Sequence, residues 1–118
     1  MTYADIVVVY APDMASPGDT VPVSVNVQNI YTATIWIAVT AVVDGVDINF
    51  TPANELVDPG WIQLFSGSFT MPNKNVTLTI WSWYFDGMDF IHDDTEIKTV
   101  SLPTPQITEF GIPSYIKA

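Results

Sequence analysis

The chain has 118 residues, of which 48% are hydrophobic and 13% aromatic, so it is large enough for one domain with a buried core. Three lysines, no arginine and thirteen acidic residues give a formal charge of −10, which argues against binding to nucleic acid or to anionic lipid. The absence of cysteine excludes disulfides and thiolate metal sites, and a single histidine argues against histidine-based zinc sites and triads. We therefore expect a protein that is not an enzyme and holds no cofactor.

Turn-forming residues recur at regular intervals and separate segments rich in Val, Ile, Thr and aromatic residues, which favour strands. No segment keeps the apolar spacing of a helix. The predicted strands are seven: residues 5–10, 20–28, 34–43, 46–50, 61–71, 76–85 and 90–102.

Three of these segments carry specific signals. In residues 20–28, valines at every second position alternate with polar residues or proline, which indicates one buried face and one wet face. Asp44-Gly45 predicts a tight hairpin between the third and fourth strands. Gly67, inside the fifth predicted strand, indicates a bulge or the close approach of another backbone.

Seven short strands with little helix predict an all-β fold, an immunoglobulin-like antiparallel β-sandwich of about seven strands in residues 1–102. A small closed barrel is the alternative, because the strand pattern alone separates the two poorly. We expect residues 103–118 to form a separate C-terminal tail or linker that contains several prolines.

Two segments carry a resemblance to a known family. Residues 15–29 read ASPGDTVPVSVNVQN, and residues 57–72 begin with Val-Asp-Pro-Gly and end with Phe-Thr-Met-Pro. A Pro-Gly turn before a Val-x-Val-x-Asn strand end resembles the CARDB and fibronectin-III-like modules of prokaryotic surface and viral proteins. The resemblance covers about residues 5–102 and implies an immunoglobulin-like fold with a role in adhesion, display or spacing. The chain departs from that pattern at Ile30-Tyr31 and in its number of tryptophans.

The tail after Leu102 is rich in proline but also in large apolar residues, which a linker would usually lack. It is interpreted either as a linker stub or as a segment that docks on its own domain or on a neighbouring subunit. The residues expected to dock are Ile107, Phe110, Ile112, Tyr115 and Ile116.

The N-terminal residues contain no basic segment followed by an apolar run, as an export signal would, and no run is long enough to span a membrane. Two locations fit an extracellular type of sandwich with this N-terminus. The first is the virion, for a protein assembled inside a host cell, and the alternative is the cell surface, for a module of a larger secreted protein.

Acidic residues gather around the last predicted hairpin, and Asp86, Asp89, Asp93 and Asp94 form a candidate site for Ca²⁺, which prefers oxygen ligands. Their spacing does not match the calcium loop of an EF-hand. The favoured interpretation is a solvated turn and strand edge with no metal, where charges also prevent pairing of sheet edges. His92 is interpreted as an ordinary strand residue.

Alternation along residues 76–85 places Trp81, Trp83 and Phe85 on the face opposite the predicted core. If residues 34–43 are the neighbouring strand, Trp36 joins them on one outer face. The alternative is that Trp36 lies in the core, as a third-strand tryptophan does in many immunoglobulin domains. An outer aromatic patch of this kind predicts a surface for a protein partner or a sugar.

These features predict a non-enzymatic structural or adhesive module that acts through protein–protein contacts, including self-association, and most specifically a virion decoration or appendage protein. The alternative is a carbohydrate-binding module that stacks sugar rings on its aromatic side chains. A two-carboxylate glycosidase is the least favoured of the three, because such pairs need a cleft.

Overall fold

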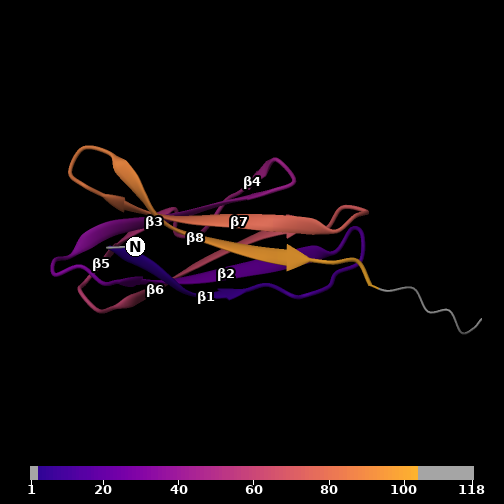
Figure 1. The fold of residues 1–118 in the computed structure, drawn as a ribbon, viewed down its shortest axis with the longest axis horizontal. Helices are drawn as coiled ribbons and strands as arrows, with labels where there is room; N and C mark the ends of the chain where they lie inside the picture. The colour runs from indigo at the N-terminus through magenta and orange to yellow at the C-terminus, as the bar shows by residue number, and fades with distance from the viewer. Residues whose placement is uncertain (1–2, 104–118) are drawn as a thin grey trace, which may run out of the picture.

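The computed structural model describes residues 3–103, which form two antiparallel β-sheets packed face to face (Figure 1). The strands are β1 (Ala4–Tyr10), β2 (Thr20–Asn29), β3 (Ile35–Val43), β4 (Val46–Ile48), β5 (Asn54–Val57), β6 (Ile62–Thr70), β7 (Val76–Phe85) and β8 (Phe90–Val100). Within the described residues, no helix is long and apolar enough to cross a membrane. The predicted β-sandwich is confirmed.

One sheet has three strands in the order β1-β2-β6, and the other has the order β4-β3-β7-β8. β5 also pairs with β3, so β4 and β5 lie end to end along the same edge of β3. The predicted pairing of the third strand with the strand of residues 76–85 is confirmed, with Ala38 opposite Trp83 and Thr40 opposite Trp81.

The core lies between the sheets and consists of the alternate residues expected from the sequence. The four alternate valines of β2 are fully buried, and in β7 the buried positions are Val76, Leu78, Ile80 and Ser82. Phe65 of β6 is the largest fully buried side chain. Alternation was enough to assign these faces because each strand has one dry side and one wet side.

The structure adds an eighth strand to the predicted seven. β5 has only four residues, Asn, Glu, Leu and Val, and pairs with one end of β3. Its two polar residues are depleted in strands, and the segment is too short to produce a visible alternation. The tight hairpin at Asp44-Gly45 is present between β3 and β4, with Asp44 at φ 51° and Gly45 at φ 76°.

Gly67 allows the two sheets to meet at one side of the sandwich. The chain leaves β4, crosses to β6, where Thr51 and Ser66 exchange backbone hydrogen bonds of 2.8 and 3.0 Å, and then returns to form β5. A Cβ on Gly67 would lie 2.8 Å from the Asn49 carbonyl oxygen and 2.9 Å from Ile48 Cγ2. The β2–β6 register continues through Gly67 without a shift, so the second of the two interpretations, close backbone approach, is correct.

Candidate functional site

The aromatic residues expected on an outer face do lie there. β3 presents Trp36, which is 43% exposed, so the interpretation that places it in the core is wrong. Trp81, Trp83 and Phe85 of β7 are half-buried on the same face. We call this surface the aromatic face and define it by these four residues together with Leu56 of β5 and Phe90 of β8.

Contacts between neighbouring strands hold the aromatic face in place. The Trp83 indole Nε1 donates a 2.8 Å hydrogen bond to Thr40 Oγ1, and its ring lies 5.6 Å from the His92 ring. Phe85 and Phe90, paired across β7 and β8, have ring centroids 5.3 Å apart at a tilt of 50°. These contacts hold the rings of Trp83, Phe85 and Phe90 against their neighbours.

At one end of this face there is a shallow hollow of about 210 Å³ between Trp36, Asn54, Phe85 and Phe90. Phe90, which lines the hollow, is 39% exposed, and Leu56 of the neighbouring β5 is 49% exposed. The outward positions next to these rings include the uncharged Ala38, Thr40 and Thr95, together with His92 beside Trp83. In a protein with a formal charge of −10, an uncharged aromatic surface is the part of the sheet best suited to burial against a partner.

The acidic residues of the last hairpin have separate backbone partners. Asp86 folds over its own turn, where Oδ1 accepts hydrogen bonds from the N–H groups of Met88 (2.8 Å) and Asp89 (2.9 Å). The N–H groups of Asp89 and Met88 hold the pKa of the Asp86 carboxyl below its usual value. Asp86 therefore shapes the β7–β8 hairpin.

Asp93 and Asp94 instead bind the edge of β1. The β7–β8 register shifts between Ser82 and Trp83, so that Asp93 is an extra residue in β8. Asp93 Oδ2 accepts hydrogen bonds from the N–H groups of Tyr3 (3.1 Å) and Ala4 (2.8 Å), and Asp94 Oδ2 accepts one from Ile6 (2.9 Å). These carboxylates thus accept hydrogen bonds from N–H groups along the β1 edge that no strand among the described residues pairs with.

Ser82 completes this contact from inside the sandwich. Its fully buried hydroxyl donates to the Ala4 carbonyl oxygen at 2.6 Å and accepts from the Asp94 N–H at 3.1 Å. Burial raises the pKa of the neighbouring Asp5 carboxyl, and the charge of Asp94 raises it further. The β1–β8 contact is thus made by side chains and brings the carboxylates of Asp5 and Asp94 close together.

Three of the four candidate calcium ligands, Asp86, Asp93 and Asp94, thus accept backbone hydrogen bonds at separate places. Within residues 3–103, no three Asp, Glu or His side chains converge as metal ligands would. His92 Nε2 lies 2.8 Å from Thr95 Oγ1 and packs against Trp83, as an outward strand residue. The residues expected to dock from the tail, from Ile107 to Ile116, lie outside the described residues.

Two features at the Tyr31 end of the sandwich were not anticipated from the sequence. Asn29, which directly follows the predicted strand of residues 20–28, is fully buried, and its Nδ2 donates to the carbonyl oxygens of Val57 (2.8 Å) and Ala33 (2.9 Å). Near it, Tyr3 stacks on Tyr84 with ring centroids 3.9 Å apart and contacts Tyr31 at 4.6 Å. These three rings come from distant parts of the chain, so no spacing in the sequence could bring them together.

No protein-family model matches this chain, and no curated protein sequence matches it either. Solved structures are similar in fold. A CARDB domain from Pyrococcus furiosus, solved in complex with di-metal ions, superposes with a TM-score of 0.58 at 14% identity over 86% of this chain and 96% of that domain. The sporulation control protein Spo0M from Bacillus subtilis gives a TM-score of 0.60 at 13% identity and covers 89% of this chain, which spans about half (51%) of Spo0M.

A fragment of alpha-2-macroglobulin from Escherichia coli gives a TM-score of 0.63 at 14% identity over 86% of this chain and 17% of that one. At these identities the likeness establishes the fold alone. The chain therefore has an immunoglobulin-like sandwich similar to that of a CARDB domain, as the sequence resemblance implied. The two metal ions belong to the Pyrococcus domain.

Proposed function

We propose that this domain is a non-catalytic protein-interaction module that binds through the aromatic face, and that it serves as a decoration or appendage protein of a virion. The single observation that carries the proposal is the set of uncharged aromatic rings around the partly exposed Trp36. Exposed apolar surface of this kind is costly in water unless a partner covers it.

The position of the rings also supports an interface. They span β3, β7 and β8, with Leu56 of β5 extending the surface on one side, so a partner would meet a continuous sheet face rather than a loop. Tryptophan and other aromatic residues are enriched at the centre of protein interfaces, where they bury large areas with few rotatable bonds. Either a second copy of the chain or a different structural protein could supply the apolar surface that covers these rings.

The test compares Trp36→Ala with Trp61→Ala, a matched control, because Trp61 is 67% exposed and lies outside the aromatic face, just before β6. Sedimentation measures the mass of each protein over a range of concentrations, and thermal unfolding measures stability. We expect wild type and Trp61→Ala to associate and Trp36→Ala to remain monomeric at an unchanged unfolding midpoint. If the wild-type protein stays monomeric and also fails to sediment with purified virus particles, the interface proposal is wrong.

A carbohydrate-binding role is the second candidate, favoured by the hollow beside Trp36. Phe85 and Phe90 line this hollow, and Asn54 adds an amide that can exchange hydrogen bonds with a sugar hydroxyl. A glycan array separates the two roles. Glycan binding that is lost in Trp36→Ala, from a protein that remains monomeric, would favour the sugar.

A further inference from the structure

A second pocket lies beyond the edge of the aromatic face, at the end of the sandwich where the loop after β2 meets the β7–β8 hairpin. Its volume is about 250 Å³, and its lining residues are Tyr3, Tyr31, Ile35, Tyr84, Phe85 and Asp86. We call it the tyrosine pocket. It is smaller than the roughly 300–1,000 Å³ of pockets that enclose whole drug-sized ligands, so it suits one side chain.

The walls of the tyrosine pocket are fixed before any ligand arrives. The Tyr31 N–H donates a 2.8 Å hydrogen bond to Oδ1 of the buried Asn29. The Tyr3 N–H binds Asp93, and its carbonyl oxygen accepts a 2.9 Å hydrogen bond from the Ile30 N–H. A pocket whose backbone is tied on both sides loses little conformational entropy when it binds.

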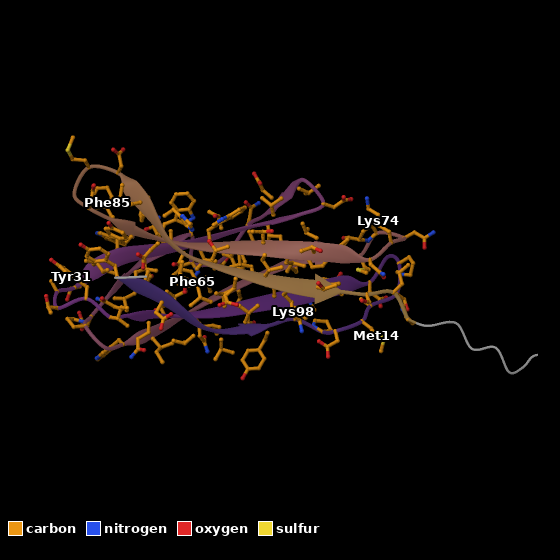
Figure 2. The ribbon with its side chains drawn as sticks, viewed as in Figure 1. Met14, Tyr31, Phe65, Lys74, Phe85 and Lys98 are labelled. Carbon is orange, nitrogen blue, oxygen red and sulfur yellow. The ribbon has the colours of Figure 1, made fainter. Side chains whose placement is uncertain are left out.

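The charged side chain that lines the pocket is acidic. Asp86 lines it, and burial raises the pKa of the Tyr84 hydroxyl, with Tyr3, Asp93 and Asp86 raising it further. In residues 3–103 the lysines are Lys74 and Lys98, which pair with Asp44 and Asp13. Figure 2 places both lysines away from the end that carries Tyr31 and Phe85. Neither of these two lysines therefore lies at the end that carries the tyrosine pocket.

We infer that the tyrosine pocket binds the cationic head group of a lysine or arginine side chain presented by a partner protein. The faces of aromatic rings carry negative potential and attract ammonium and guanidinium groups, and a nearby carboxylate strengthens that attraction. The alkyl part of such a side chain would pack against Ile35 and Phe85 while its charged end meets Asp86. Because the pocket does not include Trp36, this inference stands even if the aromatic face is not an interface.

The test is an NMR titration of the protein with labelled tyrosine rings, using N-acetyl-lysine methylamide and N-acetyl-arginine methylamide as probes. N-acetyl-norleucine methylamide is the neutral control of similar length. We expect both cations to shift the ring signals of Tyr3, Tyr31 and Tyr84 in a saturable way. Tyr10, which is 64% exposed on β1 and outside the pocket, is the internal reference and should not shift.

Two variants locate the effect. Asp86→Asn keeps an oxygen that can accept the hairpin hydrogen bonds but removes the charge, and Tyr31→Leu removes a ring but keeps an apolar wall. Each should weaken cation binding about two- to fivefold. Asp47→Asn, which removes the same charge from an exposed position on β4, should leave it unchanged. Equal shifts with the norleucine probe, the absence of a saturable shift, or equal weakening by Asp47→Asn would each overturn the inference.

Discussion

On one side of the sandwich β1 lies against β8, and on the other side β6 lies against the segment that links β4 to β5. The first contact uses the side chains of Ser82, Asp93 and Asp94, and no backbone ladder joins the two strands within residues 3–103. The second contact uses the backbone of Thr51 and Ser66 and the missing side chain of Gly67. The first junction therefore depends on side-chain hydrogen bonds and charge, and the second on backbone hydrogen bonds and steric fit.

The steric junction should show the largest effect. In Gly67→Val the new side chain would enter space already occupied by the Asn49 carbonyl oxygen and Ile48, so we expect a loss of about 2–3 kcal/mol of unfolding free energy. Gly67→Ala should cost less than Val. Chemical denaturation measures both, with Ser68→Ala, at an exposed position on the same strand, as the control. A Gly67→Val protein as stable as wild type would contradict the steric account.

The hydrogen-bonded junction should be broken next by Ser82→Ala. This change leaves the Ala4 carbonyl oxygen and the Asp94 N–H without their buried partner, and we expect a loss of about 1–2 kcal/mol. Ser24→Ala, on the opposite sheet at a half-buried position, is the control. Hydrogen exchange would add a local readout, because the amides of Ala4 and Ile6 should lose protection before those of β2. Uniform loss of protection would argue against a local junction.

Charge at the same junction gives a smaller, pH-dependent effect. The pKa of the Asp5 carboxyl is raised in the folded state, so the ionised carboxylate lowers the unfolding free energy above the folded-state pKa. This loss of stability disappears once the pH falls below the pKa of Asp5 in the unfolded chain. Asp5→Asn should therefore raise the unfolding midpoint at pH 7 and leave it unchanged near pH 3. Asp47→Asn, which removes a charge from an exposed position on β4, is the matched control. A rise of equal size at both pH values would show that charge is not the cause.

The tip of the β7–β8 hairpin lies outside both junctions. Replacing Asp86 there should change the unfolding free energy least, and it should lower stability where Asp5→Asn raises it. Since the pKa of Asp86 is lowered in the folded state, its ionised form stabilises the fold above the unfolded pKa, and this contribution is lost as pH falls through the folded pKa. Asp86→Ala should lower stability slightly at pH 7 and not at low pH. NMR titration of the Asp86 carboxyl measures the pKa directly, and a value above that of a free aspartate would contradict this assignment.

The contrast between the junctions also explains what the sequence could predict. The valines of β2 and the alternate residues of β7 gave the correct faces because burial imposes a period of two on each strand. Gly67 was recognisable because a glycine inside a strand has few other uses. Both signals are local, so they can be read without knowing the tertiary structure.

Other features depend on contacts between distant residues. Asp93 and Asp94 resembled a solvated acidic turn, because nothing in the sequence reports that a bulge in β8 directs Asp93 to β1. Asn29 carries no local signal of its role, because it binds the carbonyl oxygen of Val57, 28 residues away. The unusual Ile30-Tyr31 turn was the one local sign of the tyrosine pocket.

The direction of β1 relative to β8 determines how the domain would respond to a pulling force. Asp93 binds Tyr3, Asp94 binds Ile6 and Ser101 binds Ala15, so the two segments run parallel to each other. The start of β1 and the finish of β8 therefore lie toward opposite ends of the sandwich (Figure 1). Tension applied at Tyr3 and Pro103 would slide β1 along β8 and load these hydrogen bonds together. An antiparallel hairpin pulled from its open end breaks its bonds one after another, whereas this arrangement shares the load among them.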